Sequence, residues 1–289
     1  MIIVLKDADF YGKNIGKVEI DRQLNAYTVA AIEASGNENL TESQQFALDD
    51  LFLALGVDGS NNVLAKIRKL YLPMIASDVG NALINYATND FTKDFTPNSA
   101  NWELRNLGIT QKASGQAFSI NTFSPALVAT NITQMWLRTE NMVQGTNDRN
   151  FIFVLRGKTN DTKFLGVAEM SASSENYIQW GQTYGYNNFV TSSKLTEQRV
   201  ASGFSIRSSS DYSVMRYSSG LYETTITPST QGDMTGETAQ GLYVLGLGDQ
   251  RAPKPFGFMM LGEGIPEADF LNIASKVNAL YVALGGQTS

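Results

Sequence analysis

A long series of short apolar runs, spread between residues 75 and 261, limits the possible folds more than any other feature of the chain. Clusters of Asn, Asp, Gly and Ser interrupt these runs at intervals of roughly ten to fifteen residues, a spacing typical of β-sandwiches. No long crossover helix separates them, so neighbouring strands should be antiparallel. The pattern predicts strands over residues 117–120, 132–139, 151–155, 164–170, 177–183, 204–207, 214–217, 221–226, 243–247 and 256–261. We therefore expect a mainly β protein built as an antiparallel two-layer β-sandwich.

The last apolar run leads into the clearest helix signal in the sequence. Pro266 suits the first helical position, and Glu267 and Asp269 place negative charge in the first turn. Gly285 can adopt the left-handed conformation that ends a helix. The pattern predicts a helix over residues 266–284, with an apolar stripe formed by Phe270, Ile273, Val277, Leu280, Tyr281 and Leu284. This stripe should dock on the strand that precedes it.

A helical hairpin is expected before the sandwich, over residues 39–85. Thr41 and Gln44 form a capping box for its first helix. A second helix is predicted over residues 63–71, because apolar side chains recur there at helical spacing and Pro73 stops the pattern. The hairpin should pack against the sandwich, with an oligomer contact as the alternative.

Residues 1–38 are interpreted as an attachment arm, a short β-prone stretch followed by a helix. Such an arm cannot bury its own apolar face, so it should dock on a partner subunit or return to the body of the protein. The residues expected to make this attachment or oligomer contact are Ile2, Ile3, Val4, Leu5 and Phe10.

Composition excludes several classes of function. The chain has 289 residues with no Cys and no His, so disulfides, thiolate metal sites and histidine-based catalysis are excluded. The net charge of −6 argues against nucleic acids and anionic membranes as partners. The one dense basic cluster, Lys66, Arg68 and Lys69, is expected to be a solvated helix face. No apolar stretch is long enough for a signal-peptide core or a membrane span.

Three stretches resemble virion structural proteins of phages that infect gut Bacteroidales. They are the opening MIIVLKDADFYGKNIGKVEI, the segment KIRKLYLPMIASDVGNALINYATNDF, and the ending GFMMLGEGIPEADFLNIASKVNALYVALGG. The resemblance implies a concanavalin A-like (LamG-like) jelly roll over residues 86–289, closed by the terminal helix. It implies architecture and setting, and it brings no catalytic residues.

Loop aromatic residues are the best candidates for ligand recognition. Aromatic rings stack on sugar rings while amides bond to hydroxyls. The candidate carbohydrate-binding residues are Trp180, Tyr184, Tyr186, Asn187 and Asn188. In the alternative interpretation Trp180 is a sheet or core residue, and Trp102 and Trp136 are expected in the core.

Signals for catalysis or metal binding are weaker. A retaining glycosidase needs two carboxyl groups close together, and Glu169 is the only acidic residue in its predicted strand. The Asn and Asp pairs at 147–148 and 160–161, and Asp249, could bind calcium, but each is more simply explained as a turn residue. We expect no enzyme activity, no cofactor and no metal.

The sequence therefore favours a phage virion structural protein, a fibre or decoration subunit on the tail or head. It would be made in the cytoplasm of the bacterial host and assembled into the virion. Its expected partners are other virion proteins and further copies of itself, with host cell-surface glycans as a candidate ligand. The alternatives are a soluble carbohydrate-binding protein and, less favoured, a polysaccharide-degrading enzyme.

Overall fold

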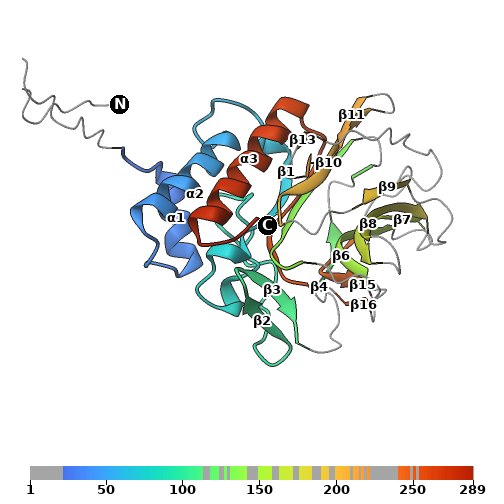
Figure 1. Cartoon of the computed structure of the whole chain (residues 1–289), viewed down its shortest axis with the longest axis horizontal. Helices are drawn as coiled ribbons and strands as arrows, with labels where there is room; N and C mark the ends of the chain where they lie inside the picture. Colours follow the sequence, from blue (N-terminus) through green and yellow to red (C-terminus); the bar gives the residue numbers. More distant parts are fainter. Residues whose placement is uncertain are drawn as a thin grey trace, which may run out of the picture.

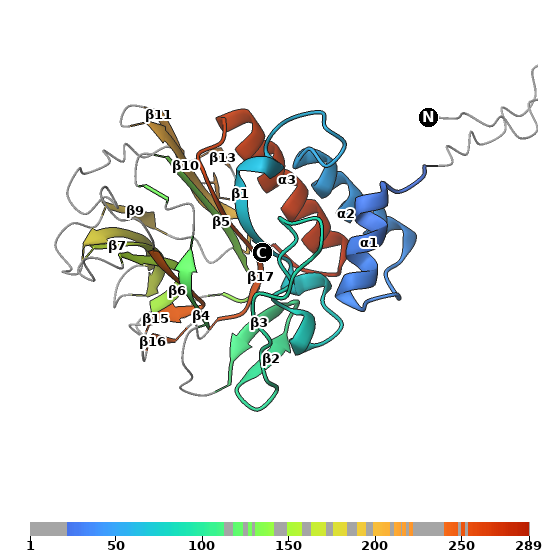
Figure 2. The ribbon, with the colours of Figure 1, turned by 180° about the vertical axis from the view of Figure 1, so that it is seen from behind.

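The computed structural model places three helices beside two large antiparallel sheets (Figures 1 and 2). It describes residues 22–112, 118–123, 127–128, 131–141, 149–157, 163–171, 176–183, 190–194, 199–208, 211–214, 216–217, 220–221, 240–247, 250–251 and 254–288. The helices are α1 (Ala26–Ser35), α2 (Glu42–Ala54) and α3 (Glu267–Ala283). The mainly β, antiparallel two-sheet architecture agrees with the prediction.

The first sheet has seven strands in the order β11-β10-β5-β17-β3-β2, with β1 also paired to β17. Its strands are β1 (Ile67–Tyr71), β2 (Trp102–Arg105), β3 (Gly108–Gln111), β5 (Ile132–Arg138), β10 (Ser202–Ser208), β11 (Asp211–Val214) and β17 (Phe256–Gly262). β5 and β17 are buried along their whole length. A sheet whose central strands are buried on both faces must be covered by two separate layers.

The second sheet has six strands in the order β4-β14-β6-β7-β8-β9. They are β4 (Phe118–Phe123), β6 (Arg149–Gly157), β7 (Lys163–Ser171), β8 (Asn176–Thr183), β9 (Val190–Lys194) and β14 (Gln240–Val244). Two short hairpins complete the described strands, β12 (Arg216–Tyr217) with β13 (Gly220–Leu221) and β15 (Gly246–Leu247) with β16 (Gln250–Arg251).

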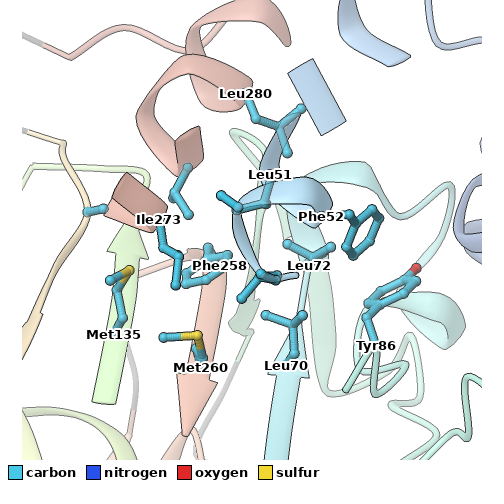
Figure 3. Packing of buried hydrophobic residues seen from close by; sticks show 14 of the residues in the cluster. Leu51, Phe52, Leu70, Leu72, Tyr86, Met135, Phe258, Met260, Ile273 and Leu280 are labelled. Atoms are coloured by element: carbon cyan, nitrogen blue, oxygen red, sulfur yellow. The ribbon is translucent and has the colours of Figure 1, made fainter. Parts of the chain in front are cut away.

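Two hydrophobic cores follow from the alternation of side chains along β5. Trp136 belongs to the core between the sheets, together with Phe153 of the second sheet. Met135 and Leu137 belong to the core between the first sheet and the helices. Figure 3 shows Met135 close to Ile273 of α3, on the helix side of the sheet. The helices thus form a third layer over the sandwich.

The predicted second helix of the hairpin is wrong. Residues 64–66 form a short 3₁₀ turn, and residues 67–71 form β1, which pairs antiparallel with β17. Leu70 then points into the helix-side core and Tyr71 into the core between the sheets. An apolar run this short fits both a helix and a strand, and the free edge of β17 decided the outcome. Lys66, Arg68 and Lys69 therefore lie on a 3₁₀ turn and a strand, not on a helix face.

The first helix of that pair is confirmed. Thr41 and Gln44 form the reciprocal capping box of α2. α2 packs against α3, and its Leu51 shares a hydrophobic core with Met135 and Phe258 of the first sheet, so this helix packs against the sandwich as expected. α1 corresponds to the helix expected at the end of the attachment arm.

The terminal helix is confirmed with a shift of one residue at each end, because Pro266 is the N-cap and Leu284 the C-cap of the helix Glu267–Ala283. Gly285 has φ +91°, and its N–H donates to the Val282 carbonyl. Among the described residues, no helix is long and apolar enough to cross a membrane.

The turn between β17 and α3 is held by side chains of two neighbouring strands. The amide of Ile265 donates to Thr133 Oγ1 at 3.1 Å and to Ser205 Oγ at 2.8 Å. The amide of Gly264 donates to Asn131 Oδ1 at 2.9 Å. A Cβ at position 264 would lie 2.2 Å from the Ile206 carbonyl oxygen, so only glycine fits there.

Candidate functional site

The predicted carbohydrate-binding residues belong to the β8–β9 region of the second sheet. Trp180 lies in β8, opposite Val167 of β7 and Val190 of β9. Its side chain lies outside the described residues, as do Tyr184, Tyr186, Asn187 and Asn188. Because β8 and β9 are antiparallel neighbours, residues 184–189 connect two adjacent strands. This site stays a prediction.

The attachment residues Ile2, Ile3, Val4, Leu5 and Phe10 also lie outside the described residues. The same holds for the calcium candidates at 147–148 and 160–161 and for Asp249. Within the part of the chain that the structure describes, no three acidic residues come together in a way that could hold a metal ion.

Glu169, the residue that a glycosidase interpretation requires, joins the two sheets. It lies on β7 and is 1% exposed. Its Oε1 accepts a hydrogen bond from Trp136 Nε1 at 2.9 Å, and its Oε2 accepts one from Arg138 Nε at 2.8 Å. Both donors belong to β5 of the first sheet. The carboxylate therefore crosses the space between the sheets.

This arrangement suits a structural role. A general acid or base must reach a substrate proton, whereas both oxygens of Glu169 already accept short hydrogen bonds in the protein interior. The Arg138 guanidinium is also buried and donates to the Glu140 carbonyl. Glu169 and Arg138 thus form a buried, hydrogen-bonded ion pair that fixes the position of one sheet on the other.

Sequence reasoning did not find the partners of Glu169. The available signal was the charged residue at the end of a predicted strand, since Arg138 ends the run ITQMWLR and lies on the same face of the strand as Trp136. An arginine on the inner face of a sandwich needs a buried acid, but the sequence does not say which acid lies opposite. Trp102 and Trp136 are both buried, as predicted.

A groove of about 510 Å³ lies between residues 77–80 and β2. Two carboxylates, Asp78 and Glu103, line it. Asp78 caps another short 3₁₀ turn, Val79–Asn81, by accepting from the amide of Asn81 at 3.0 Å. Glu103 Oε1 lies 3.2 Å from Arg105 Nη1. Lys112, also in the groove, donates to the Ser99 carbonyl at 2.6 Å. Each of these charged groups therefore has a partner nearby, and these contacts stabilise the local turn and strand.

Two of the three basic residues singled out in the sequence form ion pairs. Arg68 forms an ion pair with Glu263, and Lys69 Nζ lies 2.7 Å from Asp94 Oδ2. Asp94 also accepts a hydrogen bond from the Tyr71 hydroxyl at 2.8 Å. Burial, reinforced by the Asp94 carboxylate, raises the pKa of Tyr71 well above its usual value.

No family model matches this sequence, and no curated protein matches it. Among solved structures, the chain is similar to a "Bifunctional GH43-CE" of Bacteroides eggerthii, with 12% identity and a TM-score of 0.34. The alignment covers 59% of this chain and 23% of that protein. A likeness at this level carries no information on function.

Proposed function

We propose that this chain is a non-catalytic structural subunit of a bacteriophage virion, a fibre or decoration protein on the tail or head. The observation that carries the proposal is how the resembling segments are used in the fold. Residues 66–91 and 257–286 meet where β1 pairs with β17, with Leu70 opposite Met260. Arg68 and Glu263 add an ion pair beside this ladder. The segments that resemble virion proteins build the framework of the molecule, and this supports a structural role.

The use of Glu169 supports the absence of catalysis. The carboxylate that the enzyme alternative needs is enclosed between Trp136 and Arg138, where it stabilises the packing of the two sheets. We further propose that the two sheets belong to the concanavalin A-like jelly-roll type. The two-layer antiparallel arrangement supports this assignment at the level of architecture.

The attachment role is proposed for the segment that precedes Arg22. The Arg22 guanidinium lies 2.7 Å from Asp49 Oδ2 and 2.5 Å from Asp50 Oδ1 of α2. Burial alone would raise the pKa of Asp50, but hydrogen bonds from Arg22 and Lys276 outweigh it and lower the pKa. These ion pairs fix Arg22, where the described part of the chain begins, to α2 of the helical layer. We propose that Ile2–Leu5 and Phe10 bind a neighbouring copy or another virion protein.

We propose that the β-sandwich faces outward on the particle and binds host cell-surface glycans. Weak binding by each copy would become effective through many copies on one particle. Trp180, Tyr184 and Tyr186 remain the proposed stacking residues for this interaction.

Immunogold electron microscopy of purified virions tests the proposal, with an antibody raised against residues 90–289. Label at a defined position on the tail or capsid is the expected result, and its position separates a tail fibre from a head decoration. Antibody pre-absorbed with the purified protein is the control. An absence of label on intact particles, with a clear signal in the host lysate, would overturn the virion assignment and favour a soluble carbohydrate-binding protein.

A further inference from the structure

A second groove lies at the edge of the helical layer, far along the chain from the loop between β8 and β9. It has a volume of about 550 Å³, within the size range of small-ligand clefts. Tyr27 of α1 lines it, together with the turn that follows α2 and residues 87–89. None of the described residues that line this groove is an Asp, Glu, Lys or Arg. It therefore suits a neutral ligand.

The polar groups of the groove are mainly side-chain amides. Asn61, Asn62, Thr88 and Asn89 line it beside the apolar Val57 and Leu64. Asn62 and Asn89 are exposed, and their side chains make no hydrogen bond to the described residues. Each therefore offers one acceptor and two donor positions to a ligand.

The first wall of the groove is rigid. Asn61 Nδ2 donates to the Ala54 carbonyl at 3.2 Å, and Asn61 Oδ1 accepts from the Val63 amide at 3.0 Å. Gly56 has φ +84°, and a Cβ there would lie 2.1 Å from Asn61 Oδ1. The turn that presents Asn62 is thus held from within, so little conformational entropy would be lost when a ligand binds.

The second wall is held by Asn85. Its Oδ1 accepts from the amides of Leu70 at 3.0 Å and Ala87 at 3.1 Å. The amide of Tyr86 donates to the Leu70 carbonyl at 2.8 Å. These bonds fix the segment that carries Asn89 to β1.

An aromatic cluster supports the groove from beneath. The Tyr27 ring packs edge-on against Phe52 and Phe91, at centroid distances of 5.1 and 5.0 Å. Its hydroxyl donates to the Tyr86 carbonyl, which fixes the ring orientation. Phe91 has φ +45°, a left-handed conformation that is strained for so bulky a residue. The fold holds this conformation and so keeps the cluster in place.

We propose that this groove binds a neutral carbohydrate through Asn62 and Asn89. Side-chain amides carried on fixed backbone segments can bond to hydroxyl pairs, and Tyr27, Val57 and Leu64 can contact the faces of a sugar ring. An anionic ligand would find no cation in the groove, and a purely apolar ligand would leave both amides unpaired. The inference adds a second site to the glycan recognition proposed above, and it does not depend on the virion assignment.

Saturation-transfer NMR tests the site with the full chain and four disaccharides: cellobiose, maltose, lactose and N,N′-diacetylchitobiose. We expect transfer to at least one of them. The double variant Asn62→Ala/Asn89→Ala should bind that disaccharide about tenfold more weakly, since two amide hydrogen bonds are lost. Asn101→Ala is the matched control, because Asn101 is also exposed and lies outside this groove, and it should bind like the wild type.

Two results would overturn the inference: no transfer to any of the four disaccharides, or equal transfer to the wild type and the double variant. Equal transfer would place binding elsewhere, for instance at residues 180–188. Thermal unfolding checks that the variants are folded. If the double variant is not folded, the two single variants, Asn62→Ala and Asn89→Ala, are measured separately. If virions are labelled but no disaccharide binds at this groove, the proposed virion role stands and the groove inference fails. If a disaccharide binds at the groove but virions are not labelled, the groove inference stands and the virion role fails.

Discussion

At the scale of single residues, Glu169 has the clearest consequence. Replacing it by Gln would leave the buried Arg138 guanidinium without its counter-charge. We expect Glu169→Gln to lower the free energy of unfolding by about 3 kcal/mol, as measured by urea denaturation. Glu103→Gln is the control, because its partner Arg105 is exposed and the pair should contribute little. Equal stability of Glu169→Gln and the wild type would contradict a structural role.

Gln134 is a buried residue whose replacement should stabilise the protein, in contrast to Glu169. It is fully buried on β5, and neither its Nε2 nor its Oε1 has a hydrogen-bond partner among the residues that the structure describes. We expect Gln134→Met to raise the free energy of unfolding by about 1–2 kcal/mol, because it removes two unpaired polar atoms at similar volume. The Gln111→Met variant should raise the free energy of unfolding by less, since Gln111 Nε2 already donates to the Leu245 carbonyl at 3.1 Å. A loss of stability in Gln134→Met would indicate a partner for this amide.

At the scale of elements, the turn between β17 and α3 sets the position of the terminal helix. Gly264→Ala would force its Cβ against the Ile206 carbonyl oxygen of β10. We expect a loss of about 3 kcal/mol or more, measured by thermal and urea unfolding. Gly285→Ala is a matched comparison, because Gly285 has φ +91° but open space around it. It should cost only about 1–2 kcal/mol. Equal costs would mean that crowding at position 264 is relieved by small movements.

The elements also show where sequence patterns fail. The capping box of α2 and the closing helix were predicted because both depend on neighbours in the chain. β1 was missed because its hydrogen-bond partner, β17, lies about 190 residues later, as the register Leu70–Met260 shows. Local spacing of apolar residues holds no information on such a partner.

At the scale of the whole molecule, buried tyrosines link stability to alkaline pH. Burial raises the pKa of Tyr27 to about 12, and it raises the pKa values of Tyr71 and Tyr86 as well. The folded state then keeps protons that the unfolded state releases above about pH 10. This contribution is complete below that pH and is lost as the pH rises. Tyr71 and Tyr86 should each contribute a slope of up to about 1.4 kcal/mol per pH unit, and the partly exposed Tyr27 less.

Urea unfolding between pH 8 and pH 11 measures this slope, with Tyr86→Phe as the test variant. The Tyr86 hydroxyl has no hydrogen-bond partner within the described part of the chain, so its removal should not reduce stability at neutral pH. The variant should lose less stability at high pH than the wild type. An identical pH dependence of the variant and the wild type would mean that Tyr86 ionises at the same pH in the folded and unfolded states.

Oligomerisation tests the attachment proposal at the same scale. Deleting residues 1–20 keeps Arg22 with its two carboxylate partners and keeps α1, which buries Thr28 and Ala31. We expect the full chain to be oligomeric and the truncated chain to be monomeric in sedimentation velocity, with an unchanged melting temperature. An oligomer that survives the deletion would assign the contact to another surface.

Local sequence patterns determined the antiparallel β architecture, the helices α2 and α3, and the burial of Trp102 and Trp136. Turns, helix caps and the alternation of side chains all act between residues close in the chain. Only the tertiary structure decided that β1 is a strand paired with β17 and that Glu169 pairs with Arg138. These features depend on which distant segments meet. A buried charge or a free strand edge has many possible partners in a sequence, and packing selects one of them.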